Sequence, residues 1–271
     1  MDGLTVDVLD SSETALTKTS TLVYGDEALM IVDAGLTRSQ AHRIVAAALD
    51  TGRPVTNVLI SGAGPDFFLG AGIVADAFPD AHMFATPRVV DHILRTYERR
   101  LVQWQRLGRN LPTRRAAIDA WPDDTFEFDG RLVELRAGGE PLGWRGDYLW
   151  LPQTRTVLGG ALLYGGDHVW TAGAPTAQDR AAWAARLRDL QQVGARRVVP
   201  GHRKPGWQGD PVTWTLEYLD VFDEVVAATS DPGSAATALR ERFPDAGFLT
   251  AVHIGVKVAL GHPRPAAART R

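Results

Sequence analysis

Residues 58–70 read Val58-Leu59-Ile60-Ser61-Gly62-Ala63-Gly64-Pro65-Asp66-Phe67-Phe68-Leu69-Gly70. The first three side chains are apolar, which predicts a buried strand. Gly62, Gly64 and Pro65 follow at once and predict a tight loop. We expect the Ser61 hydroxyl to cap that loop. The segment therefore predicts a strand that ends in a glycine-rich loop, and the rest of the chain is interpreted around it.

The composition is that of an ordinary globular protein. The 271 residues are 45% hydrophobic and 23% charged, with a formal net charge of −3, which argues against a general nucleic-acid binder. The absence of cysteine excludes disulfides, thiolate nucleophiles and cysteine-ligated zinc. The N-terminus lacks the pattern of a signal peptide, and no apolar stretch approaches the roughly 20 residues that cross a bilayer. We therefore expect a soluble, cytoplasmic protein with no membrane partner.

Strands are predicted in two groups, each followed by helices. The strands are expected at residues 4–9, 19–24, 28–32, 55–60 and 81–85, and then at 125–128, 132–135, 148–151, 156–158, 168–171 and 197–199. Helices are expected from Thr37 to Gly52, at 70–78, 87–107 and 176–193, within 112–123 and throughout the chain after Asp210. Two groups of strands with helices after each favour an α/β fold of four layers, αββα, with two mixed sheets face to face.

Three more segments resemble known motifs when they are taken with residues 58–70. They are Val32-Asp33-Ala34-Gly35, the stretch from Leu151-Pro152 to Leu163, and Val198-Val199-Pro200-Gly201-His202. Their order and spacing are similar to those of the metallo-β-lactamase superfamily. The resemblance implies a single domain over residues 1–271, with the core at about 19–206 and a helical C-terminal extension at 207–271. We expect Asp33 to lie behind the glycine-rich loop and to hydrogen-bond it.

The same resemblance implies seven metal-ligand positions, most of which have lost their ligands here. Asp66 and His202 keep ligand side chains. One carboxylate and one imidazole are too few for a stable zinc site, which needs three protein ligands or more. We therefore expect that the protein binds neither a metal nor another cofactor. We also expect open space where small residues stand at the ligand positions. The vacated positions are Gly62, Gly64, Phe67, Gly143 and Ala161, with the register of Gly143 uncertain by a few residues.

Asp66 and His202 are the candidate catalytic pair. Two ligands of one ion stand about 3–3.5 Å apart, so the pair is expected within hydrogen-bond reach once the ion is gone. A carboxylate that fixes a histidine tautomer makes a general base. Two alternatives stay open: the pair only ties two loops together, or Ser61, His202 and Asp66 form a nucleophilic triad.

Six other side chains are candidates for contact with a substrate. Aromatic residues would wall a pocket for a mostly apolar molecule, and arginine would bind an anionic group. For each, a purely structural place in the core or in a surface loop is the alternative. The candidates are Phe67, Phe68, Trp144, Arg145, Tyr164 and His168.

Two other patterns have simpler explanations. Gly70-Ala71-Gly72-Ile73-Val74-Ala75 matches a dinucleotide-binding pattern but lacks the preceding strand and the later acidic residue. The arginines from Arg88 to Arg115 are interleaved with acidic residues, which favours a solvated helix face over a nucleic-acid site.

The leading hypothesis is a metal-independent enzyme that performs acid–base catalysis on a small, mostly apolar organic molecule. The reaction would be a cyclisation, elimination, isomerisation or hydrolysis of an activated ester or lactone. One alternative is a ligand-binding protein without catalysis, a degenerate relative of the family. Another is a hydrolase with one weakly held metal. The sequence leaves open the substrate, the oligomeric state and whether the ligand losses are natural or engineered.

Overall fold

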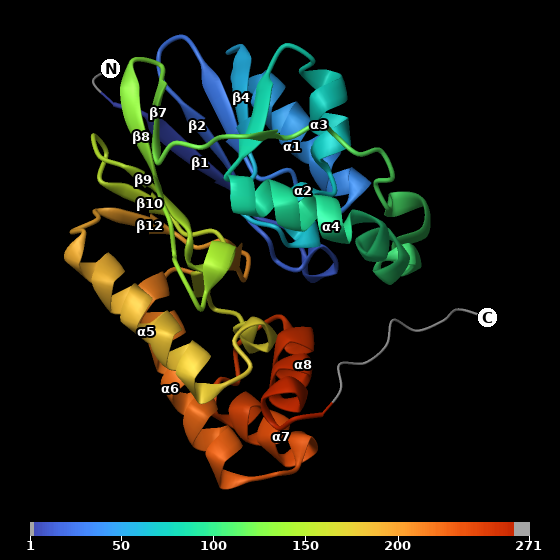
Figure 1. Ribbon diagram of the computed structural model, residues 1–271, viewed down its shortest axis with the longest axis vertical. Coiled ribbons are helices and arrows are strands. Elements are labelled where there is room, and N and C mark those ends of the chain that lie inside the picture. Colours follow the sequence, from blue (N-terminus) through green and yellow to red (C-terminus); the bar gives the residue numbers. More distant parts are fainter. Residues whose placement is uncertain (1–2, 263–271) are drawn as a thin grey trace.

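The computed structural model describes residues 3–262. Its first sheet has six strands in the order β1 to β6 (Figure 1). Neighbours among the first three strands are antiparallel, and from β3 to β6 they are parallel. The strands are β1 (Thr5–Leu9), β2 (Ser20–Tyr24), β3 (Leu29–Val32), β4 (Val55–Leu59), β5 (His82–Ala85) and β6 (Asp119–Ala120).

The second sheet has five strands in the order β12-β10-β9-β8-β7, and a separate parallel pair joins β11 to β13. The pair is important for the site because it places His202 beside Tyr164. The strands are β7 (Thr125–Phe128), β8 (Arg131–Arg136), β9 (Tyr148–Leu151), β10 (Thr156–Leu158), β11 (Tyr164–Gly165), β12 (Arg197–Val199) and β13 (His202–Arg203).

Helices cover the outer face of each sheet (Figure 1). Those on the first sheet are α1 (Arg38–Asp50), α3 (Ala71–Ala77) and α4 (Pro87–Gln103), and the four-residue α2 (Pro65–Phe68) lies in the glycine-rich loop. Those on the second are α5 (Ala177–Gln192) and α6 (Pro211–Ala228), while α7 (Pro232–Arg242) and α8 (Leu249–Ala259) pack against α6 and residues 171–173 beyond the end of the sheet. Short 3₁₀ turns are η1 (Glu13–Ala15), η2 (Gln105–Asn110), η3 (Gly143–Gly146) and η4 (Thr171–Gly173). The expected four-layer αββα arrangement is confirmed.

The β3 strand shows why the layers form. Its four side chains are all buried. Because neighbouring side chains on a strand point to opposite faces, Leu29 and Ile31 pack under the helices, whereas Met30 and Val32 pack between the two sheets. A strand that is apolar on both faces can lie only inside such a sandwich.

Two sequence predictions of local structure were wrong. Residues 168–171 form no strand; the strand of that region is β11, earlier in the chain, and residues 171–173 form η4. Residues 112–123 contain the short strand β6 instead of a helix. For β6, a pairing partner distant in sequence decides the conformation, because β6 pairs with β5.

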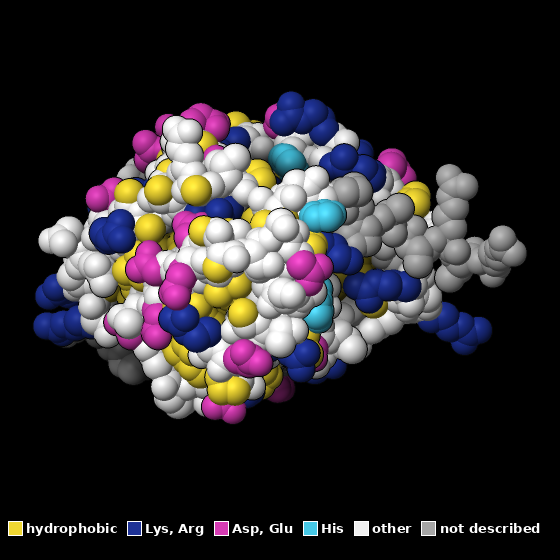
Figure 2. Space-filling model, turned by 90° about the horizontal axis from the view of Figure 1, so that it is seen from below, with side chains coloured by type: hydrophobic (Ala, Val, Ile, Leu, Met, Phe, Trp, Pro, Cys, Tyr) yellow, Lys and Arg dark blue, Asp and Glu magenta, His cyan; other side chains and the backbone are white. Residues whose placement is uncertain are grey.

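The surface has no strong segregation of charge on the face that Figure 2 shows, where acidic and basic side chains are interspersed with hydrophobic ones. Within residues 3–262, none of the helices combines the length and apolar character that a membrane crossing needs. The helices after Asp210 agree with the expected C-terminal extension as far as His262, while residues 263–271 lie outside the described range.

Candidate functional site

The glycine-rich loop is held from behind by Asp33. This residue follows β3 and has a left-handed backbone, with φ of 68°, a conformation that aspartate tolerates better than most residues. Its Oδ1 accepts a hydrogen bond from the Ser61 backbone N–H, and its Oδ2 accepts one from the Ser61 hydroxyl, both at 2.8 Å. The expectation that Asp33 supports the loop is confirmed. The Ser61 hydroxyl donates its proton to Asp33 and not to His202, which argues against Ser61 as a nucleophile.

A buried lysine that the sequence analysis did not single out completes this support. Lys18 is 1% exposed, and its ammonium donates to Asp33 Oδ2 at 2.6 Å and to the Thr19 carbonyl at 2.5 Å. The same ammonium lies 4.3 Å from the ring centre of Phe67. A cation and an anion this deeply buried must be paired. Lys18 therefore fixes one positive charge beside the glycine-rich loop.

Asp66 and His202 meet across the site. Asp66 comes from α2 and His202 from β13, and His202 Nε2 lies 2.8 Å from Asp66 Oδ2. Both residues are 5% exposed. The predicted hydrogen-bond contact is confirmed. Burial alone would raise the pKa of Asp66, but the hydrogen bond and charge of His202, aided by Lys18, hold that pKa below its usual value.

Two aromatic rings stack nearly parallel to the His202 imidazole. The Tyr164 ring centre is 4.8 Å away with an interplanar angle of 8°, and that of Phe248 is 6.2 Å away at 7°. Burial raises the pKa of the Tyr164 hydroxyl far above its usual value, so this phenol stays neutral. The imidazole is therefore held by a carboxylate at one nitrogen and by stacked rings.

A cavity of about 190 Å³ adjoins the pair. Of the predicted contact residues, Phe67, Trp144, Arg145 and Tyr164 line it, as do the vacated positions Gly64 and Ala161. Pro65 of the glycine-rich loop also lines it. Additional lining residues come from segments without any recognisable motif: Leu16, Arg100, Gln103, Trp104, Trp170, Trp183, Phe248 and Ile254.

Four of the predicted site residues lie elsewhere. Phe68 is buried beside Tyr97 in the core under the helices. His168 is fully buried, and its Nδ1 lies 3.1 Å from the Tyr218 hydroxyl, which places it in the core between β11 and α6. Gly62 and Gly143 also do not line the cavity.

The comparisons with known proteins agree with the fold. Residues 14–202 match the family described as the metallo-beta-lactamase superfamily. The chain belongs to the metallo-β-lactamase superfamily. A metallo-beta-lactamase family protein from Thermus thermophilus shares the fold, with a TM-score of 0.63 and 14% identity over 95% of this chain and 93% of that one. A metallo-beta-lactamase from Pontibacter korlensis gives a TM-score of 0.56 and 17% identity over 81% of this chain and 96% of that one. Curated proteins gave no significant match.

The residues at the superfamily's ligand positions do not fit a metal centre in this member. Residues 3–262 contain no group of three or more His, Asp or Glu side chains arranged to hold a metal ion. Asp66 and His202, the two ligand types retained, bond to each other.

The expectation of open space at the vacated positions holds only in part: Gly64 and Ala161 line the cavity, whereas the space beside Gly62 and on one side of Gly64 is filled. A Cβ atom on Gly62 would lie 2.7 Å from a carbon of the Phe67 ring and 3.0 Å from Trp144 Cζ3. A Cβ atom on Gly64 would lie 2.7 Å from Asp66 Oδ1 and 3.0 Å from the Phe67 ring. The Phe67 ring thus fills the space beside both glycines, because protein interiors close around small residues. A Cβ atom on Gly143, with φ of 55°, would meet nothing within 4 Å.

Proposed function

We propose that this member of the superfamily is a metal-independent acid–base enzyme that acts on a small, mostly apolar organic molecule. His202 exchanges the proton with the substrate, and Asp66 orients the imidazole and stabilises its charged form. The reaction class is one that needs no metal-bound hydroxide: cyclisation, elimination, isomerisation, or hydrolysis of an activated ester or lactone.

One observation carries this proposal: the unshared nitrogen of His202. The low pKa of Asp66 keeps it a carboxylate, which only accepts hydrogen bonds, so His202 Nε2 carries the proton between them. In the neutral ring the lone pair is then on Nδ1. This atom is buried, and among residues 3–262 it has no hydrogen-bond partner. Buried polar atoms are nearly always paired, so we assign the missing partner to a substrate donor.

The cavity indicates the substrate class. Seven aromatic side chains line it, namely Phe67, Trp104, Trp144, Tyr164, Trp170, Trp183 and Phe248. Such walls suit an apolar or aromatic body. Arg100 and Arg145 line the same space and provide positive charge for an anionic group. Because Nδ1 is buried, side chains around it must move before a substrate can reach it.

The test is turnover of a panel of aryl esters, lactones and β-eliminating substrates with a chelator present. General acid–base catalysis raises a reaction rate about 10²–10⁴-fold. The turnover rate of His202→Gln and of Asp66→Asn should therefore each fall at least about 100-fold. His42→Gln, an exposed histidine on α1, is the matched control and should keep full activity. Equal activity in all four proteins would refute the proposal.

The ligand-binding alternative gives a different result. A protein that only binds would show no turnover of any panel compound, but its melting temperature would rise with ligand concentration. Activity that disappears with the chelator and returns with added zinc would support the weakly held metal instead.

A further inference from the structure

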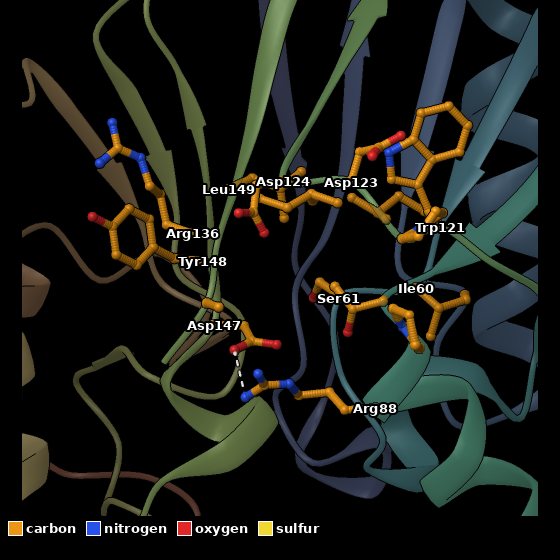
Figure 3. Close-up of a pocket in the computed structure, with 16 residues that line it drawn as sticks. Ile60, Ser61, Arg88, Trp121, Asp123, Asp124, Arg136, Asp147, Tyr148 and Leu149 are labelled. Atoms are coloured by element: carbon orange, nitrogen blue, oxygen red, sulfur yellow. Dashed lines mark ion pairs between the residues drawn. The ribbon is translucent and has the colours of Figure 1, made fainter. Parts of the chain in front are cut away.

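A second cavity, of about 320 Å³, lies at the edge of the sandwich (Figure 3). It is bounded by the end of β4, the start of α4 and the start of β9. It shares no lining residue with the cavity beside Asp66 and His202. Nothing in the proposed acid–base chemistry uses it, so its lining needs a separate explanation.

The most informative group in this cavity is the Asp147 carboxylate. Asp147 is 8% exposed. Its Oδ1 accepts a hydrogen bond of 2.7 Å from the Gly138 N–H and lies 3.9 Å from an Arg88 guanidinium nitrogen. Its Oδ2 is buried and has no hydrogen-bond partner among the described residues. Figure 3 shows one carboxylate oxygen on the Arg88 ion pair and the other directed into the cavity toward Ser61.

An unpaired carboxylate oxygen in a buried place is costly. Burial raises the pKa of Asp147, although the Gly138 N–H and the charges of Arg88 and Arg186 oppose this. A positively charged donor at Oδ2 would remove the cost through a charge-assisted hydrogen bond. A metal ion is a poor candidate for that donor, because no metal-holding cluster of carboxylates and histidines occurs in residues 3–262. An organic ammonium group fits better.

Positive charge lies next to the Asp147 carboxylate, where the start of α4 lines the cavity. The α4 helix has 17 residues, and its N-terminus carries a partial positive charge. Arg88 adds a full positive charge there, and the Thr86 hydroxyl at the N-cap is buried without a partner in the described chain. These groups favour a carboxylate. Leu59 and Leu149 add apolar surface to the lining, which also includes Asp123, Asp124 and Arg136.

We propose that this second cavity binds a small α-amino acid with an apolar side chain. Its ammonium group donates to Asp147 Oδ2, and its carboxylate accepts from Arg88 and the Thr86 hydroxyl. Its side chain lies against Leu59 and Leu149. A zwitterion pairs with both Asp147 and Arg88 at once, whereas a simple amine or a simple acid leaves one of these two charges without a ligand group.

The test is a titration of the full chain with three probes, followed by NMR of the backbone amides. L-leucine is the zwitterion, 3-methylbutylamine is the same skeleton without the carboxylate, and 4-methylpentanoate is the same skeleton without the amine. We expect saturable binding of L-leucine with shifts at Gly138 and Ser61, and binding at least 10-fold weaker for the other two probes.

Substitutions separate the site from non-specific binding. Asp147→Asn keeps a carbonyl oxygen that accepts from the Gly138 N–H, but it turns an amide N–H toward the ammonium group. The affinity for L-leucine should therefore fall about 10- to 100-fold. Arg88→Gln changes a half-exposed side chain, so it is not expected to affect folding. It should lower the affinity for L-leucine about 10-fold. Asp91→Asn, an exposed aspartate on the same helix, is the control and should bind as the original chain does.

Three results would overturn the proposal. They are no saturable binding of L-leucine, equal binding of all three probes, and binding that Arg88→Gln and Asp147→Asn leave unchanged. Loss of turnover at His202 has no bearing on these outcomes, because the two cavities share no residue.

Discussion

Replacing Lys18 by methionine would remove the buried charge that supports the glycine-rich loop. Methionine keeps an unbranched, apolar side chain of similar length, so the packing around the stem is nearly preserved. The Lys18 ammonium is 2.6 Å from Asp33 Oδ2, and both residues are almost fully buried. The substitution therefore leaves the Asp33 carboxylate buried without its counter-ion.

Breaking a buried ion pair by removing one partner costs about 3–5 kcal/mol. Asp33 keeps its two hydrogen bonds from Ser61, so we expect a loss near the lower end, about 3 kcal/mol in the free energy of unfolding. For a chain of this length, each kcal/mol lowers the melting temperature by about 2 °C, which gives a decrease of about 6 °C.

The assay is urea unfolding followed by tryptophan fluorescence, with thermal unfolding as a second measurement. The midpoint should fall while the slope of free energy against urea stays constant. Lys204→Met is the control, because that lysine is exposed and its ammonium donates to the Asp245 carbonyl, not to a buried carboxylate; its effect should be within about 0.5 kcal/mol. A Lys18→Met variant as stable as Lys204→Met would refute the assignment of a buried ion pair.

Three further substitutions test the packing and the charges. Gly62→Ala places a Cβ atom 2.7 Å from the Phe67 ring and should lower the free energy of unfolding in urea by about 1–3 kcal/mol. An equal loss in a Phe67→Leu background would contradict the conclusion that this ring fills the space beside Gly62. Burial raises the pKa of Asp167 to about 7, so its carboxyl group favours folding at low pH and loses that contribution as pH rises toward 7. Asp167→Asn should therefore raise the melting temperature at pH 8 but not at pH 4, and an equal change at both would exclude this titration. Thr215→Val removes the hydroxyl that accepts from the Tyr164 N–H at 3.0 Å, leaves that donor unsatisfied and should cost about 1–3 kcal/mol; unchanged hydrogen-exchange protection at Tyr164 would argue against the bond.

The sequence was sufficient for the elements of the fold because their signals are local. The β3 strand appears as an apolar run, and β4 leads into the apolar residues Val58 to Ile60. The capping pattern at Thr37 marks the start of α1, where its side chain accepts from the Gln40 N–H. The Asp66–His202 contact was also predictable, since two ligands of one former metal must lie close together. The separate strand pair of β11 and β13 was not, because neither two-residue segment has a pattern of its own.

The amino-acid sequence by itself determined the αββα fold, the loss of most metal ligands and the survival of one Asp–His pair, because each follows from residue types at fixed positions along the chain. Only the tertiary structure decided what replaced the ligands. The Phe67 ring packs against the glycines, and Lys18 contributes a buried charge from a segment far from the loop. Space and charge in a protein interior depend on which side chains meet there, and contacts between segments distant in sequence decide that.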